Sequence, residues 1–265
     1  MLSNKTVLLT GATGGIGSEI AKLLVDEGAT LILIGREEAR LQSLWHSLAG
    51  RHHLIQADIS TAAGRKEILN YCQQLEQDVD IVINNAGIGQ FSLFDELDED
   101  ALASIININL TSTMLLTQTL LPSLLAQPRA QVINIGSILG SIGLPGSTVY
   151  CASKFGLRGF SEALRRELLD TSVSVRYFAP RATKTDMNND QVVALNEELG
   201  TKMDSASYVA KQLVSFINTN STNYYLGWPE KLFVKINSLL PSIVEKSIFK
   251  QLPIFKLYLV DKIER

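Results

Sequence analysis

The sequence predicts one α/β domain with a parallel, doubly wound sheet of about seven strands, helices on both faces and an amphipathic helical extension at the C-terminus. Hydrophobic residues make up 46% of the 265 residues and charged residues 19%, which allows a large buried core. Short apolar runs alternate with stretches of helical periodicity. Neither a Pro/Gly/Ser-rich linker nor an internal repeat divides the chain. We therefore expect a single domain over residues 1–230, with residues 231–265 as its extension.

Seven apolar, β-rich runs are predicted as strands that are covered on both faces. They are residues 7–10, 30–34, 53–57, 81–84, 132–135, 173–178 and 224–226. The clearest helices are residues 17–27 and 153–169, in which apolar side chains recur every three to four positions. Strict alternation of strands and helices predicts right-handed crossovers and hence a parallel sheet.

Residues 101–128 carry no charge, which raises the question of a membrane span. Two asparagines, four threonines, two glutamines and Pro122 interrupt the stretch. A helix buried on most sides within the domain is therefore the better prediction.

Charge and cysteine content narrow the function classes. With 24 Lys+Arg and 27 Asp+Glu the net charge is −3, so we expect no nucleic-acid partner. Cys72 and Cys151 are too few for a disulfide framework or a thiolate metal site, and we expect no metal. The N-terminus leaves no room for the apolar core of a signal peptide before the first strand. These features predict a cytoplasmic protein.

A glycine-rich turn follows the first predicted strand and leads directly into a helix. It reads Thr10-Gly11-Ala12-Thr13-Gly14-Gly15-Ile16-Gly17. Its glycines allow a sharp turn and close approach of a pyrophosphate, to which the helix N-terminus offers free N–H groups. The spacing departs from Gly-x-Gly-x-x-Gly, and a tight turn without a ligand is the alternative. Within the predicted sheet, the turn indicates a Rossmann-like nucleotide-binding domain.

Four further motifs follow this turn. They are Asn84-Asn85-Ala86-Gly87 after the fourth strand, Asn109 in the uncharged helix, Ser137 after the fifth strand, and Tyr150-x-x-x-Lys154. Together with the turn, their order and spacing resemble the short-chain dehydrogenase/reductase family over residues 7–185. The resemblance implies an oxidoreductase that transfers hydride between a nicotinamide cofactor and a carbonyl or alcohol substrate.

Tyr150, Lys154, Ser137 and Asn109 are the expected catalytic residues. Tyr150 and Lys154 are four residues apart on a predicted helix and project from one face. A nearby ammonium favours the phenolate, so we expect the pKa of Tyr150 to be lowered, which suits general acid–base catalysis. Ser137, at a strand end, is expected to hydrogen-bond the substrate oxygen. The resemblance implies that Lys154 holds the nicotinamide ribose and Asn109 a proton-supplying water. A side chain that only satisfies a backbone carbonyl is the alternative for Asn109.

Cofactor choice is expected at the end of the second strand, where an acidic residue would bind the adenosine ribose and repel a 2′-phosphate. Gly35 stands there and Arg36 follows, which favours NADP(H) over NAD(H). The family's basic residue within the turn is missing, because Gly14 occupies its place, and Glu37 and Glu38 follow Arg36. An exposed first-turn helix residue is the alternative for Arg36.

Other cofactor contacts are expected along the same edge of the sheet. Asp58 matches the family position that contacts adenine, although it is equally suited to cap a helix. Asn84 and Asn85 are expected to brace the sheet, and Ala86 and Gly87 to keep the floor of the cofactor cleft low. The full expected set is Gly11, Thr13, Gly15, Ile16, Gly17, Arg36, Asp58, Asn85, Ala86, Gly87, Tyr150, Lys154, Pro180, Thr183 and Thr185.

The segment after the sixth strand departs from the family. Pro180 and Thr185 match, but Arg181 replaces the usual glycine. Two interpretations stay open, in which Arg181 either reaches a cofactor phosphate or anionic substrate group, or is an exposed loop side chain. Residues 186–202 are expected to form a lid over the substrate.

The extension from Lys231 has apolar residues at helical spacing, and Pro241 and Pro253 are predicted to break it into short pieces. Residues 231–265 hold seven Lys/Arg and three Asp/Glu. As a basic amphipathic segment it is expected either to lie at a membrane interface or to pack on the domain or a second subunit. In the packed case, residues 232–240 cover the domain and the pocket mouth is walled by Phe249, Ile254, Phe255 and Leu257.

The residues thus predict an NADP(H)-dependent carbonyl reductase or alcohol dehydrogenase with an apolar or lipid-like substrate, acting as a homodimer or homotetramer. Two alternatives differ in function. One is a non-catalytic nucleotide sensor or scaffold, against which the intact Ser137, Tyr150 and Lys154 argue. The other is a peripheral reductase of lipid carbonyls at the inner membrane surface.

Overall fold

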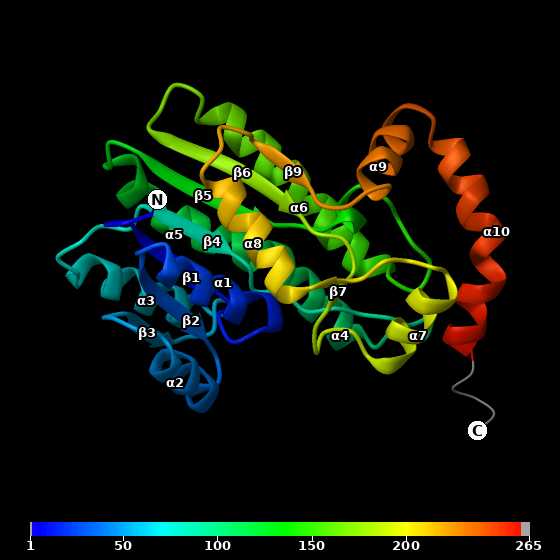
Figure 1. Cartoon of the computed structure of the whole chain (residues 1–265), viewed down its shortest axis with the longest axis horizontal. Coiled ribbons are helices and arrows are strands. Elements are labelled where there is room, and N and C mark those ends of the chain that lie inside the picture. The colour runs from blue at the N-terminus through cyan, green and yellow to red at the C-terminus, as the bar shows by residue number, and fades with distance from the viewer. Residues whose placement is uncertain (1, 261–265) are drawn as a thin grey trace.

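A computed structural model describes residues 2–260 and places a parallel seven-stranded sheet at the centre of the molecule (Figure 1). The strand order is β3-β2-β1-β4-β5-β6-β9, which confirms the predicted doubly wound class. The strands are β1 (Thr6–Thr10), β2 (Thr30–Gly35), β3 (His53–Gln56), β4 (Ile81–Asn84), β5 (Ala130–Ile135), β6 (Val173–Ala179) and β9 (Asn223–Tyr225). A separate pair, β7 (Thr183–Lys184) and β8 (Asp204–Ser205), was not predicted.

The register of β1 explains why the strands read as unbroken apolar runs. Leu8 lies beside Ile32 of β2 and Val82 of β4. Leu8 packs into the core on one face of the sheet, whereas Val7 and Leu9 pack into the core on the other. Because both faces are buried, every position of the strand has to be apolar.

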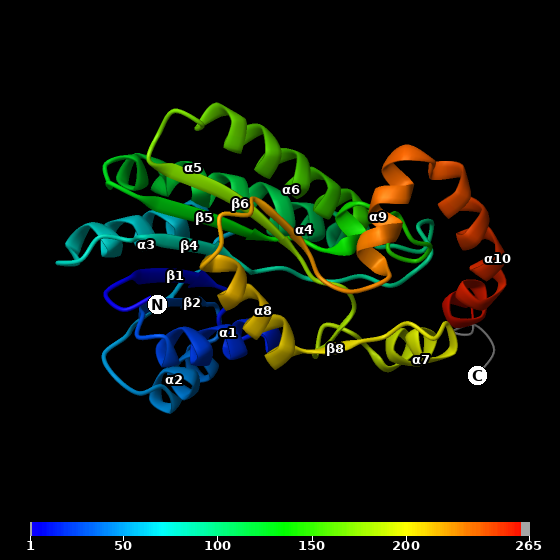
Figure 2. The ribbon, with the colours of Figure 1, turned by 45° about the horizontal axis from the view of Figure 1, so that its top comes forward.

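Helices cover the two faces of the sheet in separate layers (Figure 2). One layer holds α1 (Gly15–Asp26), α2 (Glu38–Ser47) and α8 (Ala206–Ile217). The other holds α3 (Ala62–Gln74), α5 (Ser112–Leu125) and α6 (Thr148–Glu167). The carboxyl ends of the strands are left to loops and to the C-terminal helices.

The uncharged stretch is helical, as predicted. It runs from within α4 (Glu99–Ile106) through a π turn (Asn107–Thr111) and α5, and it buries Leu116, Leu120 and Leu124. None of the helices within residues 2–260 combines the length and apolar character that crossing a membrane requires.

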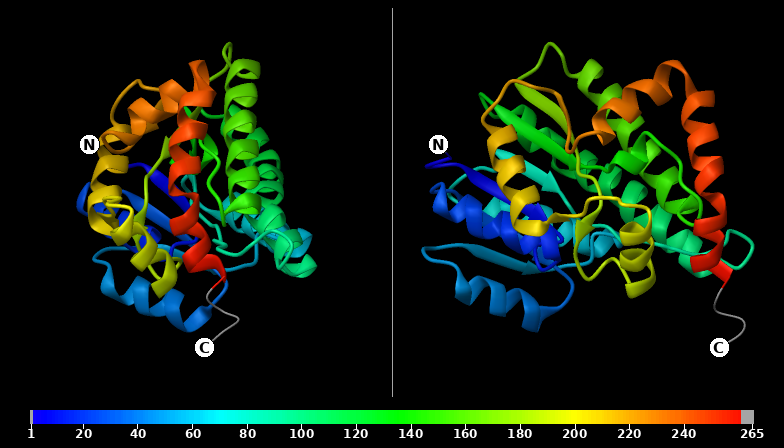
Figure 3. Two further views of the ribbon diagram at one scale, coloured as in Figure 1. Left: turned by 90° about the vertical axis from the view of Figure 1, so that its right-hand side faces the viewer. Right: turned by 45° about the vertical axis from the view of Figure 1, so that its right-hand side comes forward.

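Two helices, α9 (Glu230–Leu239) and α10 (Pro241–Val260), extend beyond the carboxyl edge of the sheet (Figures 1 and 3). Pro241 begins α10, where a missing N–H costs nothing. Pro253 lies inside α10, so the prediction that it breaks the run is wrong. Its side chain is exposed, and water can satisfy the carbonyl that lost its N–H partner.

Candidate active site

One cavity of about 1010 Å³ follows the carboxyl ends of the strands from the glycine turn to α10. It opens beside β1, where the strand order reverses. The chain runs from β1 outward to β2 and β3 on one side, and β4 then pairs with β1 on the other side. Ligands of open α/β sheets bind at this position. Residues of α7 (Asp190–Glu198) and α10 line the far end of the cavity.

The glycine turn forms a cradle that larger residues would fill. Gly11 has a φ of +61°, and a Cβ on Gly17 would lie 2.1 Å from the Gly11 carbonyl oxygen. Asn85 Nδ2 donates to the carbonyl oxygens of Thr10 (3.2 Å) and Gly11 (3.0 Å) and thereby fastens the turn to the end of β4. Gly14 precedes α1 and has no side chain with which to cap it. The helix N-terminus is therefore suited to an anion.

Asn84 braces the sheet beneath this turn, as expected for the asparagine pair. Its Nδ2 donates to Asn134 Oδ1 at 2.8 Å and to Thr117 Oγ1 at 3.1 Å. Asn134 Nδ2 donates in turn to Ser161 Oγ at 2.8 Å. This buried network ties β4 to β5, α5 and α6.

Tyr150, Lys154 and Ser137 line the middle of the cavity. Helix α6 begins at Thr148, before the predicted start, so Tyr150 lies in its first turn and Lys154 one turn later. Lys154 Nζ lies 5.7 Å from the centroid of the Tyr150 ring and donates to the Ile135 carbonyl oxygen at 3.0 Å. Ser137 follows β5, and its Oγ accepts from Leu139 N at 3.1 Å.

Burial controls the protonation of Tyr150 and Lys154. Desolvation raises the pKa of Tyr150 to about 12, and the Ser137 hydroxyl opposes this rise. Desolvation also lowers the pKa of Lys154 to about 8. The predicted lowering of the Tyr150 pKa is therefore wrong for these residues on their own. The physical reason is that the loss of water dominates, while the Lys154 ammonium donates to a backbone carbonyl.

Asn109 lies in the π turn and joins two parts of the site. Its Oδ1 accepts from Ile88 N at 2.8 Å, and its Nδ2 donates to Ile88 O at 3.0 Å and to Ser153 Oγ at 3.1 Å. This contact with a backbone carbonyl is the one anticipated in the alternative interpretation. Both N–H groups of the Asn109 side-chain amide thus have protein acceptors. The π turn sets the position of this side chain along the helix.

A second arginine, which the sequence did not predict as a cofactor contact, lies beside the glycine turn. Arg36 lines the cavity and is exposed. Arg40 also lines it, and its Nη2 donates to the Thr13 carbonyl oxygen at 3.0 Å. A guanidinium therefore lies next to the turn although the turn has no basic residue. The only signal in the sequence is the spacing of four residues from Arg36.

Asp58 also lines the cavity but does not cap a helix. Its Oδ1 accepts from Ser60 N at 2.8 Å, whereas Thr61 caps α3 by accepting from Gly64 N at 3.0 Å. The helix-cap interpretation of Asp58 is therefore wrong.

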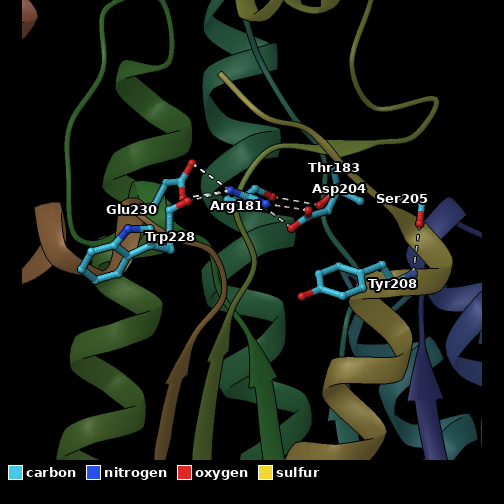
Figure 4. Close-up of polar contacts among 7 residues, drawn as sticks. All are labelled: Arg181, Thr183, Asp204, Ser205, Tyr208, Trp228 and Glu230. Atoms are coloured by element: carbon cyan, nitrogen blue, oxygen red, sulfur yellow. Dashed lines mark hydrogen bonds and ion pairs between the residues drawn. The ribbon is translucent and has the colours of Figure 1, made fainter. Parts of the chain in front are cut away.

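Arg181 is 9% exposed and lies among carboxylates (Figure 4). Its Nε and Nη2 donate to the two carboxylate oxygens of Asp204 at 2.9 and 2.8 Å. Its Nη1 donates to Glu230 Oε2 at 3.1 Å and to the Trp228 carbonyl oxygen at 3.4 Å. Arg181 also lines the cavity, but its guanidinium is buried and paired with two carboxylates, so the interpretation as an exposed loop side chain is wrong. Contact with a cofactor phosphate or an anionic substrate group stays a prediction. Arg181 fastens β8 and the start of α9 to the end of β6.

The remaining expected residues lie along the segment that leaves β6. Pro180 O accepts from Ile138 N at 3.0 Å, and Thr183 Oγ1 donates to Arg181 O at 2.8 Å. Thr185 lies over the turn, since a Cβ on Gly15 would come 2.8 Å from its methyl group. Ile16, Ala86 and Gly87 line the cavity as well.

The far end of the cavity is apolar, but its lining differs from the expected one. Phe255 lines it together with Phe233, Val244 and Ile248. Phe249 and Leu257, which were expected at the pocket mouth, are 72% and 52% exposed. They project from the opposite face of α10, because the helical repeat separates them from Val244 and Phe255.

Comparison with known proteins agrees with this architecture. The profile of the family described as short chain dehydrogenase matches residues 5–195. Nodulation protein G of Rhizobium sp. is 34% identical over 233 residues, which cover 85% of this chain and 94% of that protein. The 3-oxoacyl-(acyl-carrier-protein) reductase FabG of Rickettsia prowazekii is 31% identical over 230 residues, with 85% and 94% covered. Ketoacyl reductase HetN of Nostoc sp. is 30% identical over 255 residues, with 92% and 88% covered.

Solved structures share the fold. A short-chain dehydrogenase from Streptomyces avermitilis superposes with a TM-score of 0.80 at 24% identity, covering 95% of this chain and 97% of that one. A serine dehydrogenase complexed with NADP+ has a TM-score of 0.76 at 27% identity, covering 83% and 94%. With the profile spanning most of the chain and relatives matching nearly their whole length, this protein belongs to the short-chain dehydrogenase family of oxidoreductases.

Proposed function

We propose that the protein is an NADP(H)-dependent reductase of an apolar, acyl-like ketone, working reversibly on the corresponding alcohol. The observation that carries this proposal is the position of Ser137, Tyr150 and Lys154 in one cavity, between a glycine cradle and an apolar end. The names of two relatives, a 3-oxoacyl-(acyl-carrier-protein) reductase and a ketoacyl reductase, support a ketoacyl substrate.

The residues present fit a dinucleotide. The cradle and the N-terminus of α1 would hold the pyrophosphate, and Arg36 and Arg40 would pair with a 2′-phosphate. A Cβ on Gly87 would lie 3.2 Å from Asn109 Oδ1 and 3.7 Å from Lys154 Nζ, so glycine keeps the cavity open at its centre. The NADP+ held by the similar serine dehydrogenase supports this preference. When bound, the reduced nicotinamide supplies the hydride.

Tyr150 is the proposed proton donor. With a pKa near 12 its phenol is protonated at neutral pH, and it can give its proton to the substrate oxygen as negative charge develops there. Ser137 donates a hydrogen bond to the same oxygen. The Lys154 ammonium, 5.7 Å from the ring centroid, stabilises the phenolate that remains. Asn109 holds the backbone of Ile88 against α6 and so keeps the wall of the site in place.

The apolar end of the cavity is the proposed acyl site. Phe233, Val244, Ile248 and Phe255 line it, and α10 also contributes the polar Ser247 and Gln251. A chain of methylene groups extending from the carbonyl would exchange water for this lining, at about 0.8 kcal/mol for each methylene buried.

The test is NADPH oxidation with 3-oxoacyl thioesters of increasing chain length. We expect turnover by the unaltered protein and a loss of roughly 10²- to 10⁴-fold in Tyr150→Phe, because the ring stays but the proton donor is removed. NADPH binding, followed by fluorescence titration, should be retained. Tyr208→Phe, an exposed tyrosine of α8, is the matched control and should keep full activity. Near-normal turnover in Tyr150→Phe would refute the mechanism, and binding without turnover on every ketone would favour a nucleotide sensor.

A further inference from the structure

The outer side of α9 and α10 concentrates exposed apolar side chains. Fourteen large hydrophobic side chains are exposed within residues 2–260, and eight of them lie between residues 228 and 257. They are Trp228, Leu232, Phe233, Leu239, Leu240, Ile243, Phe249 and Leu257. Trp228 and Phe233 also line the cavity, so we call the other six side chains the tail face. Helix α10 lies at the right-hand end of the molecule in Figure 1 and crosses its front in the left view of Figure 3.

Exposed lysines are interleaved with these apolar side chains. They are Lys231, Lys235, Lys246, Lys250 and Lys256. Of the two acidic residues in the described parts of α9 and α10, Glu230 is paired with Arg181, and Glu245 forms no ion pair with a described residue. Glu198 of α7 also lies beside α10, where it accepts from Tyr258 OH at 2.7 Å. The tail face is therefore basic, although the whole chain has a net charge of −3.

This pattern of charge distinguishes between two surfaces that could cover the tail face, a second copy of the chain and an anionic bilayer. A second copy of the chain, related by a twofold axis, would bring the same lysines against one another. An anionic bilayer instead offers an apolar layer for Phe249 and Leu257 and phosphate groups for the lysines, whose long side chains reach outward to the headgroups. We propose that α9 and α10 dock this protein on the surface of an anionic membrane.

The opposite side of α10 faces the cavity, which gives the docking a function. Val244, Ile248 and Phe255 line the apolar end of the cavity, and Phe249 and Leu257 lie on the outer side of the same helix. Docking would thus place the acyl end of the cavity one helix away from the lipid. The substrate is accordingly a membrane-resident amphiphile with a keto group. This second step rests on the proposed function, whereas the membrane contact does not.

The membrane contact is tested by co-sedimentation of the full chain with vesicles. We expect binding to vesicles rich in phosphatidylglycerol, little binding to pure phosphatidylcholine, and weakening by salt. Lys246→Gln, Lys250→Gln and Lys256→Gln together should weaken binding roughly 100-fold, at the usual strength of a lysine near an anionic surface. Phe249→Ser with Leu257→Ser should also abolish binding. Leu169→Ser, at an equally exposed site between α6 and β6, is the matched control and should bind normally.

Two results would overturn the proposal. One is a full chain that stays in the supernatant with anionic vesicles at low salt. The other is a dimer, seen by light scattering, that the Phe249→Ser and Leu257→Ser changes dissociate without any vesicle binding, since the tail face would then be a subunit interface. Turnover of a short, water-soluble ketoacyl thioester should be equal in all variants. Its loss from the unaltered protein would count against the proposed function and not against the docking.

Discussion

Burial of Lys154 makes the stability of the protein depend on pH. Its side chain is 5% exposed, and its pKa falls from 10.5 to about 8. Between these values the unfolded chain binds a proton that the folded chain does not, so the stability contributed by Lys154 rises with pH. Below the pKa of Lys154 in the folded state, this side chain is charged and buried, which lowers the free energy of unfolding.

Lys154→Met should remove this dependence. We expect the difference in unfolding free energy between the unaltered protein and the variant to move in favour of the unaltered protein by about 2–3 kcal/mol from about pH 7 to about pH 10. Urea unfolding at the two pH values measures it, and the subtraction cancels groups common to both proteins. A difference that does not change with pH would show that Lys154 is hydrated in the folded state.

Cofactor choice is also decided by single residues. Gly35→Asp with Arg36→Ala should shift the ratio of NADP+ to NAD+ affinity towards NAD+ by about tenfold or more, because a carboxylate repels the extra phosphate. A Cβ at Gly35 would lie 3.3 Å from Leu41 Cδ1, so the new side chain needs only a small shift of that leucine. Calorimetric titration with both nucleotides gives the ratio.

Arg40→Ala tests the second guanidinium in the same titration. It should weaken NADP+ binding and leave NAD+ binding nearly unchanged. Arg51→Ala, an exposed arginine before β3 and hence at the opposite edge of the sheet, should change neither. Equal affinities for both nucleotides in the unaltered protein would mean that Arg36 and Arg40 do not contact the cofactor.

At the scale of elements, Arg181 joins the segment after β6 to β8 and to α9, neither of which is part of the main sheet. It pairs with Asp204 of β8 and Glu230 of α9, and the neighbouring Ser205 caps α8 by accepting from Tyr208 N at 3.1 Å (Figure 4). Residues 186–202, which are expected to form the lid, connect β7 to β8, so the pair of Arg181 with Asp204 lies at the end of this segment.

Arg181→Gly, which restores the usual family residue, should therefore destabilise this protein. It leaves Asp204, 4% exposed, as an unpaired buried carboxylate, which typically costs about 3–5 kcal/mol. Urea unfolding measures the loss, and limited proteolysis should cut the lid sooner. Adding Asp204→Asn and Glu230→Gln should recover part of the stability. Arg166→Ala, which removes an exposed pair with Glu162, should cost about 1 kcal/mol or less. If Arg181→Gly costs no more than this control, the cluster does not hold the lid.

At the scale of the whole molecule, the cavity joins the sheet edge to a helix far along the chain. Ile248 of α10 lines its apolar end, while the adjacent Phe249 lies outside. Ile248→Trp should fill that end and lower kcat/KM for long 3-oxoacyl thioesters by about tenfold or more, with little effect on the shortest ones. Phe249→Trp is the matched control and should leave soluble substrates unaffected at every length. An equal loss at all lengths would show that acyl chains do not occupy this end.

The predicted strands were correct to within one or two residues, except that the short β7 and β8 were missed. A strand buried on both faces has to be apolar at every position, and this requirement is visible locally. The glycine turn and the spacing of Tyr150 and Lys154 are local as well, since they depend on close backbone approach and on one helical turn.

The tertiary structure decided what depends on distant partners. The two carboxylates that pair with Arg181 lie 23 and 49 residues away in the sequence, and the sequence around Arg181 does not predict these contacts. The pKa of Tyr150 rises rather than falls because the surrounding fold removes water from its side chain. Many residues contribute to this burial, and the four-residue spacing from Lys154 contains no information about it. The helical repeat predicted that the extension has two faces. Packing against α7 and α9 decided which of them lines the cavity and which stays exposed.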